Sequence, residues 1–195
     1  LVALGLVHPD KVRRNADAQV GDRLILGKPL GVGIYSAALK KEVLDAAGYA
    51  QMIASTTRLN TPGPDLADLP GVHAMTDVTG FGLAGHALEM ARGSGVTVAI
   101  DWAAVPFLPG VADLAQAGHV TGASGRNFAA YGHEIVLPAD FGALNQALLT
   151  DPQTSGGLLV SCDPANVEAV LAVFRRHGFD CAVEIGEVLP PEVSP

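Results

Sequence analysis

Residues 75–86 read Met75-Thr-Asp-Val-Thr-Gly-Phe-Gly-Leu-Ala-Gly-His86, and this segment is the most informative one for predicting the fold. An apolar run over residues 72–78 predicts a β-strand, and the spacing of apolar residues over 83–91 predicts a helix. The glycines between them predict a tight turn whose backbone N–H groups are open to an anion. The order is therefore strand, glycine-rich turn and helix, with Asp77 at the end of the strand.

Three interpretations of this turn are open from the residues alone. Asp77 beside two threonines favours a magnesium–nucleotide site, because Mg²⁺ prefers one or two carboxylates together with phosphate oxygens. The glycine spacing 80, 82 and 85, followed by Asp101, matches a dinucleotide-binding fingerprint, although a carboxylate before the first glycine would repel a pyrophosphate. In the third interpretation Asp77 caps the helix, and the glycines only let strand and helix pack closely.

Outward from the turn, helices and strands are predicted to alternate along the whole chain. Predicted strands cover residues 1–7, 23–26, 72–78, 96–100, 134–137, 157–162 and 182–188, and predicted helices cover 34–47, 50–59, 83–91, 111–116, 142–149 and 165–177. Residues 61–70, rich in proline and glycine, are predicted to form a loop. Interleaved helices and strands predict a sheet covered by helices.

Composition and charge restrict the class of protein. The chain has 195 residues, 49% of them hydrophobic and 16% charged, which indicates a folded domain. Its formal net charge of -8 argues against binding to nucleic acid or to an anionic membrane surface. No apolar run reaches the length of a membrane span, residues 1–7 lack the features of a signal peptide, and two cysteines without a C-x-x-C pair favour a reducing cytoplasm. Because the chain begins with Leu1, we expect it to be part of a longer protein.

Three further polar segments are candidates for ligand contact. Lys28, before a proline–glycine turn, would suit an anion site or simply a solvated strand edge. Arg126 and Asn127 lie in a predicted Gly/Ser-rich loop, where the guanidinium would grip phosphate or pair with an acid. Ser155, followed by two glycines, would let the backbone approach a ligand or form a tight turn before a strand, and the turn is favoured.

Other chemically capable residues are assigned structural roles. His86 and Glu89 lie one helical turn apart, but without a second histidine segment they indicate a packed or solvated helix face. Cys162 and Cys181 stand among Leu, Val and Ala with no adjacent base, so both are predicted to be buried and unreactive. Asp101 is more typical of a cap or turn than of a ribose-binding acid.

Four segments together resemble one known family. They are Thr76-Asp-Val-Thr-Gly-Phe-Gly82, Lys28-Pro-Leu-Gly-Val-Gly33, Arg126-Asn127 with Tyr131-Gly132, and Asp151-Pro-Gln-Thr-Ser-Gly-Gly-Leu-Leu159. Taken in order, they are similar to the second half of selenophosphate synthetase (selenide, water dikinase). The similarity runs from about His8 to Val188; the stretch after Leu59-Asn60 departs from the family's pattern, with Thr61 where a basic residue is expected.

The resemblance implies a fold and a division of the chain. The implied fold is that of the C-terminal domain of aminoimidazole ribonucleotide synthetase, an α+β protein with a layered α/β/α sandwich and a mixed sheet. Residues 1–20 would be the end of a truncated N-terminal ATP-binding domain with a linker, and residues 21–195 would be the C-terminal domain. The family's reactive cysteine or selenocysteine, its neighbouring lysine and its further metal-binding aspartates belong to the half that is not matched.

The resemblance also implies an activity. The family converts ATP, selenide and water to selenophosphate, AMP and phosphate, with Mg²⁺ as cofactor, and Asp77 is the one metal ligand that maps onto this sequence. No catalytic nucleophile maps, so the chain alone is expected to be inactive. Homodimerisation through the missing N-terminal domain is implied as well. The alternatives are another ATP-using enzyme of the aminoimidazole ribonucleotide synthetase superfamily, or a noncatalytic nucleotide-binding module.

Overall fold

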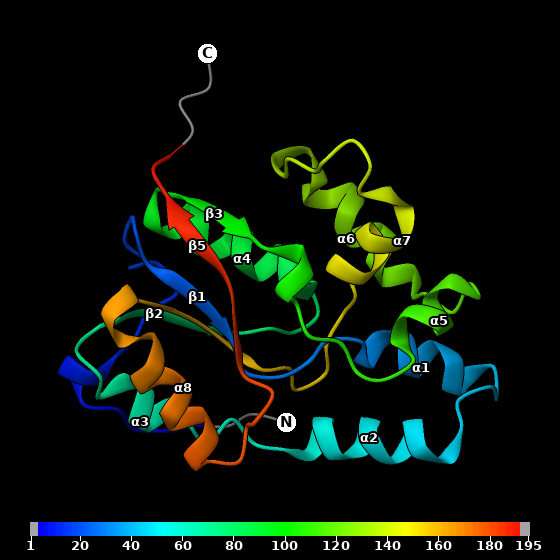
Figure 1. The fold of residues 1–195 in the computed structure, drawn as a ribbon, viewed down its shortest axis with the longest axis horizontal. Coiled ribbons are helices and arrows are strands. Elements are labelled where there is room, and N and C mark those ends of the chain that lie inside the picture. The colour runs from blue at the N-terminus through cyan, green and yellow to red at the C-terminus, as the bar shows by residue number, and fades with distance from the viewer. Residues whose placement is uncertain (1–3, 192–195) are drawn as a thin grey trace.

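A single five-stranded sheet organises the computed structural model, which describes residues 4–191 (Figure 1). The strands are β1 (Arg23–Leu26), β2 (Val72–Asp77), β3 (Thr97–Ile100), β4 (Leu158–Cys162) and β5 (Val183–Leu189). They lie in the order β2-β4-β1-β5-β3, and each neighbouring pair is antiparallel. The expected mixed sheet is therefore corrected to an antiparallel one, because no two adjacent strands run in the same direction.

Helices cover both faces of this sheet, which confirms the α+β layered sandwich. Leu24 and Leu26 of β1 pack with α4 (Gly82–Ser94) on one face, whereas Ile25 points to the other face, which α3 (Gly63–Ala67) and α8 (Val167–Arg176) cover. This alternation follows from the pleat of a strand, in which successive side chains point to opposite sides. The two apolar clusters hold the three layers together.

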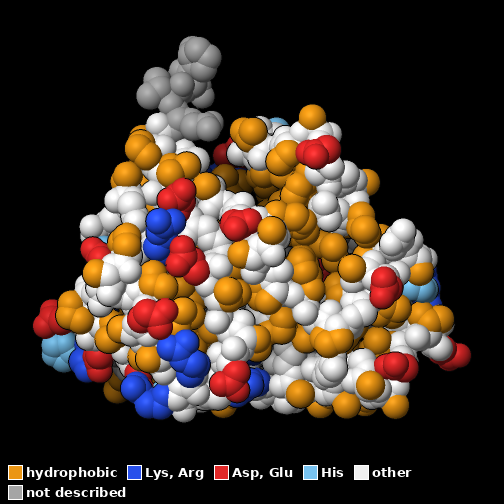
Figure 2. Space-filling model, viewed as in Figure 1, with side chains coloured by type: hydrophobic (Ala, Val, Ile, Leu, Met, Phe, Trp, Pro, Cys, Tyr) orange, Lys and Arg blue, Asp and Glu red, His pale blue; other side chains and the backbone are white. Residues whose placement is uncertain are grey.

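Most of the remaining helices form a third apolar cluster beside the sheet (Figure 1). The helices that contribute to it are α1 (Val32–Lys40), α2 (Ala46–Thr57), α5 (Val111–Gln116) and α7 (Gly142–Leu149). Helix α6 (Gly122–Tyr131) instead adds Tyr131 to the cluster that contains α4. The buried Ile34 and Tyr35 of α1 pack there with residues of α5 and α7. In Figure 2, hydrophobic side chains surround a hollow in the upper part of the molecule. No helix in residues 4–191 is long and apolar enough to cross a membrane.

Several predicted elements need correction where tertiary context overrides local pattern. The predicted helix over 34–47 ends at Lys40, because Glu42 takes a left-handed conformation (φ 58°) and Asp45 caps the next helix through the amide of Gly48. The predicted loop over 61–70 contains the short helix α3.

Two predicted strands are wrong for lack of a partner strand. Residues 4–7 form no strand, with Leu4 and Leu6 fully exposed, and residues 1–3 lie outside the described part of the chain. Residues 134–137 follow a 3-10 turn, and Ile135 and Leu137 pack on the core without joining the sheet. An apolar run becomes a strand only where a neighbour takes up its backbone hydrogen bonds.

Candidate functional site

The glycine-rich turn sits where β2 ends and α4 begins, at one edge of the sheet. Its backbone is fixed by the loop before β4. The amide of Val78 donates to the carbonyl of Gly157 (2.9 Å), and the amide of Gln153 donates to the carbonyl of Thr79 (2.9 Å). Residues 76–82 and residues 151–159, which lie far apart in the sequence, are therefore hydrogen-bonded to each other and form one structure.

Glycine is required at two positions because other backbone segments approach them closely. A Cβ at Gly82, where φ is +70°, would lie 2.7 Å from the carbonyl carbon of Thr150. A Cβ at Gly156 would lie 2.0 Å from the carbonyl oxygen of Val78. No Cβ fits at such distances. Glycine at position 82 lets the turn lie against the backbone of Thr150, and glycine at position 156 lets the loop before β4 lie against Val78.

Helix α6 braces the turn from the other side. Asn127 donates its amide hydrogens to the carbonyls of Gly80 (2.9 Å) and Thr150 (3.1 Å). Tyr131, one helical turn further, donates its hydroxyl to the carbonyl of Phe81, and burial raises the pKa of Tyr131 to about 12. The predicted loop at Arg126 and Asn127 is thus a helix, and the partners that its two hydrogen-bonding side chains have in the turn lie about fifty residues earlier in the chain.

Asp77 ends β2 with an exposed side chain. Within residues 4–191, no hydrogen bond or ion pair involves its carboxylate, and the N-terminus of α4 has no side-chain cap. The helix-capping interpretation is therefore wrong. An unpaired carboxylate at this place suits a hard cation, which takes oxygen ligands.

Asp77 fits a metal site to which other ligands, such as phosphate oxygens, also contribute, and not a site built from this chain's side chains alone. In the described residues no three His, Cys, Asp or Glu side chains come together in a group that would hold a metal ion. A single carboxylate holds Mg²⁺ only when phosphate oxygens and other ligands join it. The residues present therefore fit Asp77 as one ligand of such an ion.

The dinucleotide-binding interpretation is also wrong. That fingerprint requires a parallel strand–helix–strand unit. Here β2 and β3, the strands on either side of α4, lie at opposite edges of an antiparallel sheet. Asp101 accepts a hydrogen bond from the amide of Ala103 (3.1 Å), and so caps a 3-10 turn as expected.

The Asp151–Gln153 segment proves to be the N-terminal cap of α1. One oxygen of Asp151 accepts from the amides of Gly33 (3.0 Å) and Ile34 (3.4 Å), and the side-chain carbonyl of Gln153 accepts from the amides of Gly31 and Val32 (both 3.2 Å). Burial raises the pKa of Asp151 to about 7, and its other oxygen is buried without a hydrogen-bond partner among residues 4–191. The sequence resemblance included these residues without revealing this role.

Lys28 is buried, not solvated as a strand-edge lysine would be. Its ammonium donates to the carbonyls of Ser55 (3.2 Å), Arg58 (2.7 Å) and Ser155 (2.6 Å). Burial, with a smaller contribution from the charge of Arg58, lowers its pKa to about 8. Lys28 therefore ties the end of α2 to the loop before β4, and Ser155, with φ of 51°, takes the turn role that was favoured.

Exposure bears on the predictions for Arg126 and for the two cysteines. Arg126 is exposed and forms no hydrogen bond or ion pair with other residues in the described range, so the alternative in which it pairs with an acid finds no partner there. Cys162 is buried as predicted, with burial raising its thiol pKa to about 12, whereas Cys181 is exposed. The prediction for Cys181 is corrected because it lies in the turn before β5, outside the core.

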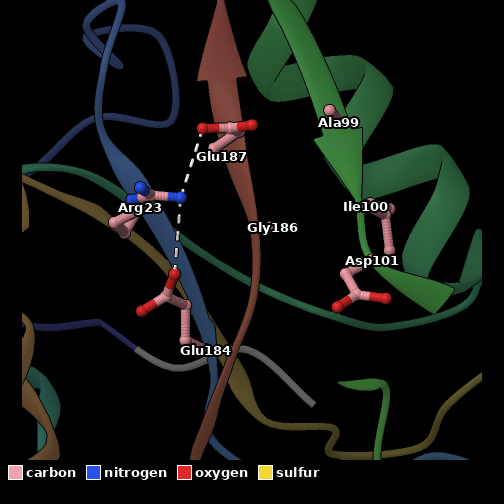
Figure 3. Close-up of a pocket in the computed structure, with 7 residues that line it drawn as sticks. All are labelled: Arg23, Ala99, Ile100, Asp101, Glu184, Gly186 and Glu187. Atoms are coloured by element: carbon pink, nitrogen blue, oxygen red, sulfur yellow. Dashed lines mark hydrogen bonds and ion pairs between the residues drawn. The ribbon is translucent and has the colours of Figure 1, made fainter. Parts of the chain in front are cut away.

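Asp77 lines neither of two cavities found elsewhere on the molecule. The first, about 410 Å³, holds the carboxylates of Asp101, Glu184 and Glu187, and Arg23 bridges the two glutamates (Figure 3). The second, about 430 Å³, is mainly apolar and lies between β3 and α7. Residues 78–82 of the glycine-rich turn do not line either cavity.

Comparison with known proteins supports the resemblance noted from the motifs. The chain is 64% identical over 189 residues to "Selenide, water dikinase" of Burkholderia pseudomallei (strain K96243), which covers 97% of this chain and 53% of that protein. It is 64% identical over 192 residues to the protein of the same name from Paraburkholderia xenovorans (strain LB400), with 98% and 54% covered. The chain thus spans about half the length of the curated relatives it matches.

Solved structures share the fold at low sequence identity. Escherichia coli HypE has a TM-score of 0.68 at 22% identity, over 91% of this chain and 47% of that one. The hydrogenase maturation protein HypE in complex with ATP has a TM-score of 0.64 at 21% identity, over 94% and 47%. The family described as "AIR synthase related protein, C-terminal domain" matches residues 19–194. The chain belongs to this family.

Proposed function

We propose that this chain is the C-terminal part of an ATP-dependent phosphotransferase that makes selenophosphate from ATP, selenide and water, with AMP and phosphate as the other products. The observation that carries the proposal is Asp77, an exposed and unpaired carboxylate at the end of β2, in a turn braced by α6 and by the loop before β4. The names of the relatives that share over half of its residues support the same activity.

Asp77 would hold one position of a Mg²⁺ ion that also binds nucleotide phosphates. When bound, such an ion neutralises charge on phosphoryl oxygens and orients them for in-line transfer. The turn contributes rigidity: with Asn127 and Tyr131 bonded to its carbonyls, the backbone next to Asp77 cannot shift without breaking those bonds. Asp77 is thereby placed before the ligand arrives, which reduces the entropy cost of binding.

The proposal extends to the organisation of the whole protein. Residues 1–20 would end a preceding ATP-binding domain and its linker, and residues 21–195 would form the C-terminal domain. The preceding domain would supply the reactive residue, further metal ligands and the surface through which two copies pair. The protein would act in the cytoplasm. The exposed side chains of Leu4, Leu6 and Val7 are in keeping with a segment whose partner lies outside this chain.

The test uses a polypeptide in which this chain replaces the matching part of the Burkholderia pseudomallei relative. The readout is selenide-dependent formation of AMP from ATP at limiting Mg²⁺. We expect the joined protein to be active and Asp77→Asn to lower its rate by about a hundredfold or more, because a metal-bound charge is lost while the shape is kept. Asp113→Asn, an exposed aspartate on α5, is the matched control and should leave the rate unchanged.

Two results would contradict the proposal. One is a wild-type rate for Asp77→Asn at limiting Mg²⁺. The other is selenophosphate formation by the 195-residue chain alone, since Asp77 without other ligands should hold the metal weakly. A joined protein that binds nucleotide but forms no AMP would favour a noncatalytic nucleotide-binding module.

A further inference from the structure

Three polar side chains lie close together at the glycine-rich turn and the start of α4. The hydroxyl oxygen of Thr79 lies 3.0 Å from Nε2 of His86, and Nδ1 of His86 lies 3.5 Å from a carboxylate oxygen of Glu89. Thr79 follows Asp77 by two residues, while His86 and Glu89 are on the first turns of α4. From the sequence, the histidine and the glutamate were predicted to lie on a packed or solvated helix face.

Because His86 is buried, its ring nitrogens depend on protein groups and not on water for their hydrogen-bond partners. Its side chain is 8% exposed, and its Nδ1 is buried with no hydrogen-bond partner in the described part of the chain. The carboxylate of Glu89, whose side chain is 55% exposed, lies beside this nitrogen at the 3.5 Å given above. A carboxylate beside one ring nitrogen favours the proton on that nitrogen, so we expect a neutral His86 to carry its hydrogen on Nδ1, the nitrogen that faces Glu89.

This tautomer determines the direction of the bond to Thr79. With Nδ1 protonated, Nε2 of a neutral ring carries a lone pair and can only accept. The hydroxyl of Thr79 must then donate its proton to His86, and its oxygen keeps both lone pairs for another partner. The backbone of Thr79 is itself fixed, because its carbonyl accepts from the amides of Gln153 (2.9 Å) and Gly82 (3.0 Å).

We propose that Thr79 presents its hydroxyl oxygen, together with the Asp77 carboxylate, to the cation bound at this turn, and that His86 and Glu89 are positioning residues for that hydroxyl. This inference rests on the proposed function, in which Asp77 is a metal ligand. It adds a second oxygen donor from the same turn and explains a buried histidine that the phosphotransferase activity does not otherwise use. A hydroxyl that already donates its proton is a better cation ligand than a freely rotating one.

The chain contains a similar trio that serves as an internal control. His177, at the end of α8, lies 3.1 Å from the hydroxyl of Thr61 through Nδ1 and 2.9 Å from Asp65 through Nε2. This trio connects α8 to α3 and the residues before it, and no free carboxylate precedes its threonine by two residues. Changes there test the general effect of removing a threonine–histidine–acid contact.

The first test is the tautomer of His86, measured in the 195-residue chain by long-range ¹H–¹⁵N NMR at a pH where the ring is neutral. We expect the proton on Nδ1 and a bare Nε2. A proton on Nε2 would overturn the inference, because Thr79 would then accept from the ring and lose a lone pair. Glu89→Gln should weaken the preference for the Nδ1 tautomer.

The second test is Mn²⁺ binding to the same chain, followed by paramagnetic broadening of the amide signals of residues 77–82. Thr79→Val and His86→Leu should each raise the dissociation constant by about tenfold, as loss of supporting groups around a metal does. Thr79→Ser and His86→Gln keep the hydroxyl and an acceptor and should remain near the wild-type value. His177→Leu is the matched control, and the amide spectrum of every variant reports whether it is folded.

The outcomes separate this inference from the proposed function. If Asp77→Asn leaves the broadening of residues 77–82 unchanged, the metal role of Asp77 fails and the inference fails with it. If Asp77→Asn abolishes the broadening but Thr79→Val and His86→Leu bind like wild type, only the inference is overturned. If His86→Leu and His177→Leu weaken binding equally, His86 has no specific role and the inference is overturned.

Discussion

Asp151 shows how burial changes the behaviour of a single residue. Its carboxylate caps α1 and is almost inaccessible to water, and one of its oxygens has no hydrogen-bond partner in the described part of the chain. Burial disfavours the charged form more than the cap favours it, so the pKa rises to about 7 from an ordinary value of 3.8. Nothing in the sequence indicated this, because the amides that meet the carboxylate come from a segment more than a hundred residues earlier in the chain.

The raised pKa predicts a specific pH dependence. Between about pH 4 and pH 7 the folded state keeps a proton on Asp151 that the unfolded state has lost, so the free energy of unfolding falls as pH rises through this window. Asp151→Asn removes this contribution. Relative to wild type, the variant should gain on the order of 2 kcal/mol between pH 5 and pH 8. Urea unfolding followed by the fluorescence of Trp102 measures it, and an equal difference at both pH values would contradict the account.

Among the elements, helix α6 and the glycine-rich turn are joined by side-chain hydrogen bonds from Asn127 and Tyr131. Helix α6 was missed from the sequence because Gly122, Ser124 and Gly125 are poor helix formers. The helix forms because the side chain of Thr121 caps it through the amide of Ser124 (3.2 Å), and because Asn127 and Tyr131 have partners in the turn. Turn and helix stabilise each other, which a local pattern cannot reveal.

This brace predicts a cost for Asn127→Ala. The carbonyls of Gly80 and Thr150 lose their donor; Thr150 is buried, and an unpaired buried acceptor costs about 1 to 3 kcal/mol. We expect a loss of about 2 kcal/mol in the free energy of unfolding, with faster hydrogen exchange of the amides in residues 79–82. Asn145→Ala on α7 is the control, since no side-chain hydrogen bond of Asn145 occurs in the described structure. Equal costs for the two variants would contradict the brace.

At the scale of the whole molecule, the sequence predicted most elements but not how they assemble. The strands near residues 23, 72, 97, 158 and 183 were placed to within a residue or two. Their order was not, because β1 pairs with β4 and β5, whose residues lie more than 130 positions away. Likewise, Asp77 was identified from its motif, whereas Thr79, His86 and Glu89 were connected only by the turn's three-dimensional course.

The proposed function requires that Asp77 binds the metal of a nucleotide site, and that residues outside this chain complete this site. The most direct measurement is a crystal structure of the joined polypeptide with Mn²⁺ and a nonhydrolysable ATP analogue, with Mn²⁺ located by anomalous scattering. We predict a manganese ion within about 2.2 Å of an Asp77 carboxylate oxygen and in contact with the analogue's phosphates. Manganese bound to the phosphates while the Asp77 carboxylate pairs with protein groups instead would contradict the claim.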